Sequence, residues 1–276
     1  MIAVAEPPAP ATGVEENQPR TIAELSKTVS ASRLSTWQRC RLQFHFRYVA
    51  GIQKAPTPAL HVGTVIHTVL HQWNLARWRG TRLAEDEFKR IFCNAWAIWQ
   101  EGEKIDWDGK EEKCKSSAWS ILQHYLRNTP IPADEKPQAV EVGVEADLAA
   151  HGLPVLVGVI DLVRSGGRIV DFKTSARTPD AKMLAHTTET QMSTYGVLYR
   201  EATGGKENGI ELHHLIKTKK PKFVMNEFGP VSEPQITRLF HVIEAYVNGL
   251  QRDDFVPSPG VQCASCEFFQ ECRAWR

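Results

Sequence analysis

Two carboxylates and an ammonium group lie in one short apolar stretch of this sequence. The segment GVIDLVRSGGRIVDFKTSA covers residues 158–176, with Asp161 in its first apolar run, Asp171 in its second and Lys173 two residues later. A buried charge is costly unless it is paired or holds a metal ion. Neighbouring carboxylates repel each other unless a cation lies between them, and Mg²⁺ or Mn²⁺ prefers such oxygen ligands. The segment could therefore form a metal site, with a surface ion pair as the alternative.

The spacing of these residues predicts a β-hairpin. The two apolar runs are expected to form central antiparallel strands joined by the turn SGG at 165–167. Asp161 lies four residues before the turn and Asp171 four residues after it, so the carboxylates can lie nearly opposite each other. Lys173 shares a face with Asp171 because residues i and i+2 of a strand point the same way. Its ammonium would lie beside the metal, where it can orient or help to deprotonate a nucleophile.

Two further groups of polar side chains have helical spacing. Gly63, His67 and His71 lie at i, i+4 and i+8 and would share one stripe of a helix, with Gly63 allowing close approach to the sheet. Gln191 and Tyr195 are spaced i and i+4 and could present an amide and a phenol to a DNA strand. A histidine on such a stripe is more often a polar-face or core residue, as we interpret His71. Tyr195 could equally pack in the core.

Six cysteines form a second set of possible ligands. They are Cys40, Cys93, Cys114, Cys263, Cys266 and Cys272. The last three form C-x2-C-x5-C, which in an intracellular chain indicates a metal site more often than a disulfide. Cys40 is the expected fourth ligand, because Cys93 and Cys114 lie in helical runs and are expected to be buried structural thiols. Spacing does not separate Zn²⁺ from an iron–sulfur cluster, since both accept four thiolates.

Composition limits the class of protein. The chain has 276 residues, 42% of them hydrophobic, and a net charge of +1, so any nucleic-acid binding must come from a local patch. One candidate is KTKKPK at 217–222, for which a solvated turn is an equal alternative. The sequence contains neither a long apolar run nor a secretory signal, which predicts a cytoplasmic protein without membrane contact. We expect a disordered tail at 1–29 and a single domain at 30–276.

Periodicity predicts an α/β domain built around one central sheet. Residues 139–148 alternate apolar and polar side chains, which adds a third strand to the hairpin. A second hairpin is expected at 209–229. Helices are expected at 32–49, 60–78, 85–100, 110–127, 188–204 and 233–250.

Several of these motifs together resemble a known family. GVIDLV followed by IVDFKT resembles motifs II and III of the PD-(D/E)XK nuclease superfamily, particularly its RecB-like branch. GTVIH at 63–67, QMSTY at 191–195 and STWQRC at 35–40 resemble further motifs of that branch, in the same order. The cysteine arrangement is similar to that of the AddB nuclease domain and the CRISPR-adaptation nucleases. The resemblance extends from about residue 30 to residue 272.

The resemblance implies a restriction-endonuclease-like core, with a central mixed sheet flanked by helices. It implies a Mg²⁺ or Mn²⁺ site and a water molecule positioned by Lys173. The implied metal ligands are His67, Asp161, Asp171 and the backbone carbonyl of Phe172. The resemblance favours a [4Fe-4S] cluster over Zn²⁺. Such a cluster would join the N-terminal segment to the tail at 257–276. The cluster ligands would be Cys40, Cys263, Cys266 and Cys272. Glu145, on the polar face of the preceding strand, is a weaker candidate for the metal site.

The expected activity is metal-dependent hydrolysis of phosphodiester bonds in DNA, with single strands or ends as the substrate. Repair, recombination and CRISPR adaptation are the candidate pathways. The sequence carries no helicase motor motif, so a helicase or CRISPR-adaptation proteins would be separate partners. The alternative is a catalytically inactive, cluster-stapled DNA-binding or scaffold module.

Overall fold

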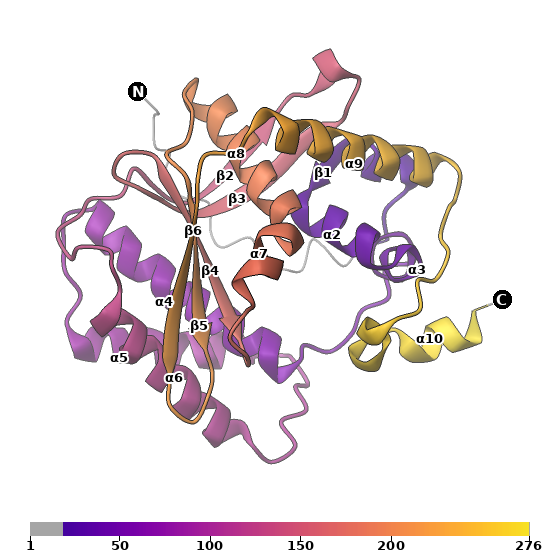
Figure 1. The fold of residues 1–276 in the computed structure, drawn as a ribbon. Coiled ribbons are helices and arrows are strands. Elements are labelled where there is room, and N and C mark those ends of the chain that lie inside the picture. Colours follow the sequence, from indigo (N-terminus) through magenta and orange to yellow (C-terminus); the bar gives the residue numbers. More distant parts are fainter. Residues whose placement is uncertain (1–18, 276) are drawn as a thin grey trace.

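A six-stranded mixed sheet forms the centre of the protein (Figure 1). The computed structural model describes residues 19–275. The strands follow the order β1-β3-β4-β5-β6, and β2 pairs with β3 outside that path. Their bounds are β1 Thr28–Ser30, β2 Ala139–Ala146, β3 Val155–Arg164, β4 Arg168–Ser175, β5 Ile210–Ile216 and β6 Lys222–Phe228. The pairs β1–β3 and β4–β5 are parallel and the others antiparallel, as a mixed sheet requires.

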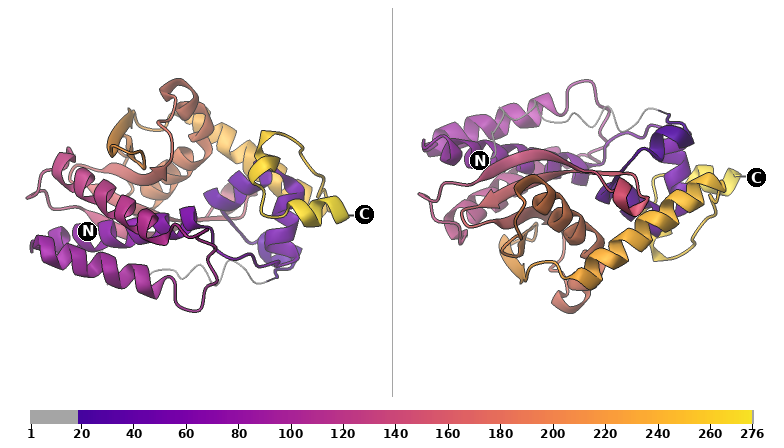
Figure 2. Two further views of the ribbon diagram at one scale, coloured as in Figure 1. Left: turned by 90° about the horizontal axis from the view of Figure 1, so that it is seen from below. Right: turned by 90° about the horizontal axis from the view of Figure 1, so that it is seen from above.

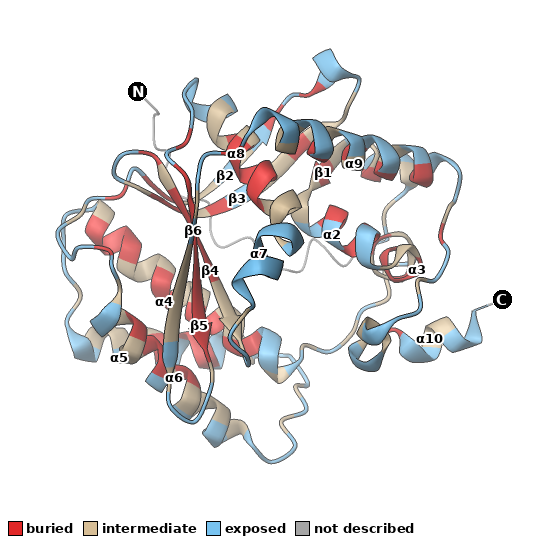
Figure 3. Ribbon diagram, in the orientation of Figure 1, coloured by how far each residue is buried: buried red, intermediate tan, exposed pale blue. Residues whose placement is uncertain are grey.

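Helices cover both faces of the sheet (Figure 2). One face carries α4 Pro58–Trp78, α5 Glu85–Ile98 and α6 Glu111–Asn128, and the other carries α2 Ala31–Arg39, α7 Ala181–Thr187, α8 Glu189–Thr203 and α9 Glu233–Gln251. The short helices are α1 Ile22–Leu25, α3 Arg41–Phe44 and α10 Phe269–Ala274. Each face has its own hydrophobic core, and the buried residues follow the inner sides of these elements (Figure 3). Within residues 19–275, no helix combines the length and apolar character needed to cross a membrane.

Two strands, β1 and β4, share one edge of β3, and this leaves an opening in the sheet. β2 pairs with β3 from Leu156 to Val163, so β1 and β4 must share the opposite edge of β3. β1 occupies that edge only at 155–157, and the ladder with β4 begins only at the Leu162–Val170 pair. Residues 158–161 of β3 therefore have no strand partner on this side, and Asp161 lies at the end of this unpaired section.

The predicted elements are largely present, with three corrections. The helix expected at 32–49 is broken at Cys40, whose extended backbone (φ −167°, ψ 115°) ends α2 and separates it from α3 and a π-helical turn at 45–49. The predicted tail at 1–29 extends too far, because α1 and β1 lie within it. Leu25 and Val29 are fully buried, so these residues belong to the core. The remainder of that prediction, residues 1–18, lies outside the described part of the chain.

The third correction concerns β2, whose alternation is interrupted. Val140 packs in the core against α4, whereas Val142 and Val144 pack in the core against α8. Glu141 lies between them with φ 46°, in the left-handed region that a non-glycine residue rarely adopts. Such an irregularity turns consecutive side chains to the same face. The sequence alternates without interruption here, so the pattern contained no signal of it.

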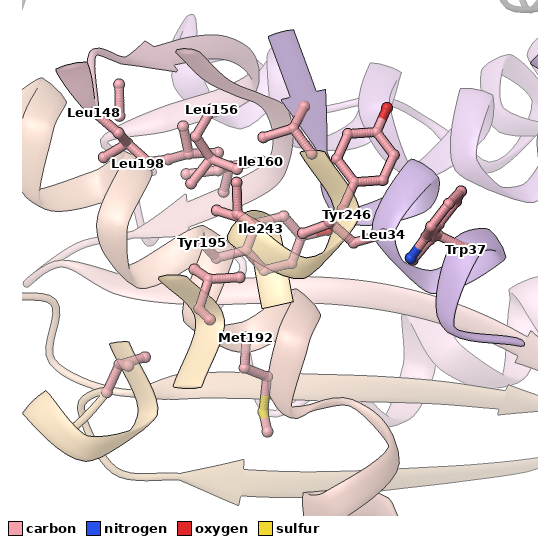
Figure 4. Close-up of a cluster of buried hydrophobic side chains, with 14 of the residues drawn as sticks. Leu34, Trp37, Leu148, Leu156, Ile160, Met192, Tyr195, Leu198, Ile243 and Tyr246 are labelled. Atoms are coloured by element: carbon pink, nitrogen blue, oxygen red, sulfur yellow. The ribbon is translucent and has the colours of Figure 1, made fainter. Parts of the chain in front are cut away.

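The core against α8 and α9 joins the two ends of the chain (Figure 4). Trp37 of α2 packs edge-on against Phe44 and Tyr246, with ring centroids 5.3 and 5.5 Å apart. Gly249 of α9 makes room for this indole, since an added Cβ would lie 2.2 Å from a Trp37 ring carbon. This contact fixes the helix that ends at Cys40.

We predict that Gly249→Ala lowers the free energy of unfolding by about 1–3 kcal/mol, because the methyl group overpacks the Trp37 ring. Helix propensity alone would change stability in the opposite direction, by up to about 1 kcal/mol in favour of alanine. Gly143→Ala is the control, because an added Cβ there has no neighbour within 4 Å. Urea unfolding followed by tryptophan fluorescence measures both variants. A stable Gly249→Ala protein would contradict this account of the packing.

Candidate active site

Asp161 marks the point where β3 and β4 separate. The ladder between these strands stops at the Leu162–Val170 pair, so the Phe172 N–H has no strand partner on that side. Oδ2 of Asp161 accepts this N–H at 3.0 Å. The register, continued by one residue, would place Asp161 opposite Asp171, as the spacing predicted. The hydrogen bond holds the Asp161 carboxylate at the opening and draws the Phe172 backbone toward it.

Asp171 lies in a dense set of donors on the opposite face from α4. Its side chain is 2% exposed. Oδ1 accepts hydrogen bonds from the Tyr195 hydroxyl at 2.7 Å, from Gln191 Nε2 at 2.9 Å and from Lys173 Nζ at 3.0 Å. Oδ2 is buried without a well-aligned hydrogen bond, and Lys173 Nζ lies 2.8 Å from it. One carboxylate oxygen is therefore saturated with donors, while the other has a single ammonium beside it.

Gln191 and Tyr195 both hydrogen-bond to Asp171. Both side chains point from α8 to the Asp171 carboxylate, and Gln191 Nε2 also donates to the Tyr195 hydroxyl at 2.8 Å. Tyr195 is 6% exposed and lies among core side chains (Figure 4). These contacts fit a positioning role for both side chains, and the expected contact with DNA stays a prediction.

His67 approaches from the other side of the sheet. Its Nδ1 lies 3.6 Å from Asp161 Oδ2. One turn earlier, Gly63 faces β4, and an added Cβ there would lie 3.3 Å from Thr174 Oγ1. The missing side chain lets α4 pack close to the strand, which brings the imidazole to the opening. His71, a further turn along, instead contacts the Glu141 carboxylate.

The electrostatics of Asp161 differ from those of a carboxylate in an ordinary ion pair. Burial raises the pKa of Asp161 to about 6; the nearby His67 opposes this increase and the Asp171 carboxylate adds to it. Burial and the adjacent Asp171 anion raise the pKa of Tyr195 well above its usual value, so Tyr195 acts as a neutral donor. The opening therefore carries more negative charge than its single ammonium offsets.

The donor set fits a hard divalent cation. The His67 imidazole lies 3.6 Å from the Asp161 carboxylate, the Asp171 carboxylate is near enough to raise the pKa of Asp161, and Asp171 Oδ2 is buried without a regular hydrogen bond. These are the ligand types that Mg²⁺ or Mn²⁺ accepts. In residues 19–275, however, no group of three or more His, Cys, Asp or Glu side chains is arranged so that it could hold a metal ion. The ligand set of His67, Asp161, Asp171 and the Phe172 carbonyl therefore remains a prediction.

Two polar residues near the opening were missed by sequence reasoning. Glu141 would be the register partner of Asp161 across β2 and β3, and it contacts His71. His214 pairs with Lys173 through the parallel β4–β5 ladder, is 5% exposed and has a buried Nε2 without a partner. Parallel pairing brings together residues that are distant in sequence, so no local pattern could find His214. The expected candidate Glu145 is exposed and pairs with Val157, away from the opening.

Four cysteines converge at the opposite end of the molecule from the β3–β4 turn. They line a cavity of about 50 Å³ together with Leu42, Phe46 and Phe268. The four are Cys40, Cys263, Cys266 and Cys272. Burial, followed by the proximity of the other three thiols, raises the pKa of Cys272. The Gly260 N–H donates to Cys263 Sγ at 3.5 Å. The four cysteines chosen from the sequence therefore line one cavity, although no group of three or more His, Cys, Asp or Glu side chains in the described chain is arranged to hold a metal ion.

The C-terminal segment is also attached to the N-terminal segment by charge. Arg47 contacts the Glu267 carboxylate, and Lys54 contacts Glu271. The prediction for Cys93 was wrong: this residue is exposed, on the outer side of α5, whereas Cys114 is partly buried on α6. A helical run fixes the backbone but not which face is covered, and only the packing of α5 decided this.

Comparison with known proteins identifies the family. Residues 28–273 match the model of the PD-(D/E)XK nuclease superfamily. The chain belongs to this superfamily of nucleases. No curated protein sequence matches it.

Solved structures support the fold. The chain is similar to the crystal structure of a presumed exonuclease from Eubacterium rectale, with 13% identity, a TM-score of 0.58, and coverage of 99% of this chain and 94% of that one. At this identity the likeness supports the fold alone. The structure of SSO0001 aligns at 12% identity over 90% of this chain and 86% of that one, with a TM-score of 0.41, which is too weak to carry an argument.

We predict that Mn²⁺ stabilises the protein against unfolding, by about 2.7 kcal/mol at a hundredfold excess over its dissociation constant. Asp161→Asn and Asp171→Asn should lose this stabilisation, because each removes one anionic ligand. Glu145→Gln is the matched control, since it removes an exposed carboxylate, and should retain the full effect. Thermal unfolding with and without Mn²⁺ measures the difference. Equal stabilisation of all four proteins would contradict the site.

A second prediction concerns pH in the absence of metal. The pKa of Asp161 is raised from 3.8 to about 6, so the folded state loses stability as pH rises through this interval. Asp161→Asn removes that cost and can still accept the Phe172 N–H. We expect a gain of up to about 3 kcal/mol at pH 7.5 and less than half of it at pH 4.5. Urea unfolding in EDTA tests this, and an equal gain at both pH values would contradict it.

Proposed function

We propose that this member of the superfamily is a RecB-like, divalent-metal-dependent deoxyribonuclease that degrades single-stranded DNA from an end. The observation that carries the proposal is the Asp171 carboxylate. It is buried beside the Lys173 ammonium, one of its oxygens is fixed by Tyr195 and Gln191, and the other makes no well-aligned hydrogen bond. A purely structural ion pair has no need of two extra donors that hold one oxygen in place.

His67, Asp161, Asp171 and the Phe172 carbonyl would hold Mg²⁺ or Mn²⁺. When bound, such an ion polarises a phosphoryl oxygen and lowers the pKa of water. Tyr195 and Gln191 orient Asp171 through Oδ1, which would leave Oδ2 available as the metal ligand. The Phe172 N–H orients Asp161 in the same way.

Lys173 handles the water and the phosphate in this mechanism. Its ammonium contacts both oxygens of Asp171. With Asp171 serving as a metal ligand, the Lys173 ammonium would be free to orient the attacking water and to offset charge on the scissile phosphate. Lys173 would then be a catalytic group rather than a counter-ion of Asp171.

The choice of DNA as the substrate and of cleavage from an end draws on the sequence motifs and on the structural relative. The sequence motifs of the RecB-like branch favour DNA as the substrate, and the structural relative is described as an exonuclease, which favours cleavage from an end. We propose a cytoplasmic enzyme of repair, recombination or CRISPR adaptation that works with a separate helicase or with CRISPR-adaptation proteins.

We also propose that Cys40, Cys263, Cys266 and Cys272 bind a [4Fe-4S] cluster, with Zn²⁺ as the alternative. The support is their convergence on one cavity and an N–H donor to Cys263. Four thiolates satisfy either group, and backbone N–H donors to sulfur are among the factors that tune cluster potentials. The proposed role is structural, because Cys40 and Cys272 are nearly at opposite ends of the described chain.

Cleavage of a labelled single strand tests the activity. With Mn²⁺ present, Asp171→Asn should leave no measurable cleavage, and Lys173→Ala should reduce the rate by at least about 100-fold, the range for loss of a group acting in proton transfer. Lys173→Ala should keep the Mn²⁺-induced rise in melting temperature, which separates catalysis from metal binding. Lys206→Ala, at an exposed position before β5, is the control.

Two outcomes would contradict the activity. Cleavage by both variants at the wild-type rate would refute the assignment of the site. Binding of DNA by the wild-type protein without any cleavage, in the presence of Mn²⁺ or Mg²⁺, would favour the inactive DNA-binding or scaffold module. Blocked 5′ and 3′ ends and circular strands then distinguish exonuclease from endonuclease action.

Metal analysis tests the cysteine site. Protein purified without oxygen should be coloured and contain about four iron atoms per chain, with matching acid-labile sulfide. Cys40→Ser should lose the iron and unfold at lower temperature, whereas Cys93→Ser should keep both properties, because Cys93 is exposed and distant in the fold from the cavity. Colourless wild-type protein with stoichiometric zinc would refute the cluster.

A further inference from the structure

The turn between β5 and β6 concentrates positive charge. The sequence KTKKPK covers 217–222, and Lys219, Lys220 and Lys222 are exposed. Three lysines elsewhere in the described chain, Lys54, Lys110 and Lys173, contact carboxylates. In the described residues, none of the four lysines of this turn has an acidic group within ion-pair distance. A chain with a net charge of +1 thus places four unpaired cations within six residues.

A backbone hydrogen bond attaches this basic turn to the end of β4, the strand that carries Asp171 and Lys173. The Lys217 N–H donates to the Ser175 carbonyl at 2.8 Å, which extends the β4–β5 contact past the end of β4. The Thr218 hydroxyl donates to the Lys220 carbonyl and closes the turn. Pro221 restricts the backbone further. The lysines are therefore presented by a defined turn rather than by a loose loop.

Parallel pairing places the turn beyond the proposed active site. Lys173 pairs with His214 and Ser175 with Ile216, so the turn begins three residues after the level of Lys173 on the same sheet. At about 3.3 Å per residue, this is about 10 Å along the strand. The turn and the end of β4 extend in the same direction, and the turn is exposed (Figures 1 and 3). Arg177, just after β4, adds another exposed cation at this end.

Protection of the sheet edge explains only part of this charge. β6 is the last strand of the sheet, and lysine and proline on an edge strand prevent pairing with other chains. Lys222 and Pro221 suit that role. The final pair of the ladder is Ile216–Lys222, however, so Lys219 and Lys220 lie beyond the edge that would need protection.

We propose that the β5–β6 turn binds the sugar–phosphate backbone of the nucleic-acid strand as it passes the active site. This inference rests on the proposed nuclease function and assigns it a binding surface outside the metal site. Lysine contacts phosphate as a point charge without reading bases, so this contact is independent of sequence and weakens with salt. It holds the strand at one side of the scissile phosphate and thereby contributes to affinity rather than to the chemical step.

Salt-dependent binding of a labelled single-stranded oligothymidylate tests the proposal. The measurement uses the whole protein in EDTA, which prevents hydrolysis, and fluorescence anisotropy at a series of KCl concentrations. For Lys219→Gln/Lys220→Gln, we expect the slope of log K against log[KCl] to fall by about 1.4 and the affinity at 0.1 M KCl to fall about tenfold, corresponding to two lost phosphate contacts. With Mn²⁺, KM for the strand should rise while kcat stays the same.

The matched control is Arg82→Gln/Lys206→Gln. It removes the same charge from two exposed positions, in the α4–α5 and α8–β5 connections. For this control variant, we expect the salt-dependence slope, the affinity and the KM of the wild-type protein. All variants should melt at the wild-type temperature, because the side chains are exposed.

The outcomes separate this inference from the function on which it rests. A wild-type protein that binds and cleaves the strand, with an unchanged slope in the turn variant, refutes the basic turn as the contact and leaves the nuclease intact. An equal loss of affinity in the control variant also refutes the basic turn as the contact, because the effect would then depend on net charge and not on the turn. A wild-type protein that neither binds nor cleaves any strand refutes the nuclease and this inference together.

Discussion

The arrangement of the site depends on an interrupted ladder between two strands. β1 and β4 share one edge of β3, and neither strand reaches the middle of that edge. Asp161 therefore has no strand partner on this edge. The Phe172 N–H, left free by the same interruption, donates to the Asp161 carboxylate. Continuous pairing would have filled this edge with backbone hydrogen bonds. The opening lets acidic groups from two strands approach a histidine from α4 on one side and a lysine on the other.

The charges at this opening oppose folding in the absence of a cation. Burial of Asp161 near Asp171 favours protonation, which is the opposite of what a stabilising ion pair would do. Neighbouring groups hold these charged side chains in place. Tyr195 and Gln191 donate hydrogen bonds to Asp171, and the close approach of α4 at Gly63 positions His67. Poorly compensated groups of this kind concentrate at functional sites, where they are prepared for a ligand.

The two ends of the chain meet away from the sheet and stabilise each other. The break at Cys40 turns one thiol toward three from the C-terminal segment, and ion pairs from Arg47 and Lys54 attach that segment to the N-terminal helices. Trp37, against Gly249 of α9, anchors the same region to the core. A group bound by the four thiolates would close a loop of more than 200 residues (from Cys40 to Cys272), whose entropic cost grows only slowly with length.

The sequence by itself determined the superfamily, the hairpin with Asp161, Asp171 and Lys173, the helix carrying His67, and the four cysteines that converge. Local spacing and turn chemistry specify such features, because they depend on neighbours in sequence. Only the tertiary structure decided that Tyr195 donates to Asp171, that Cys93 is exposed, that Glu141 distorts β2, and that parallel pairing places His214 beside Lys173. Those outcomes depend on which faces pack together and which distant strands pair, and these contacts leave no periodic signal in the chain.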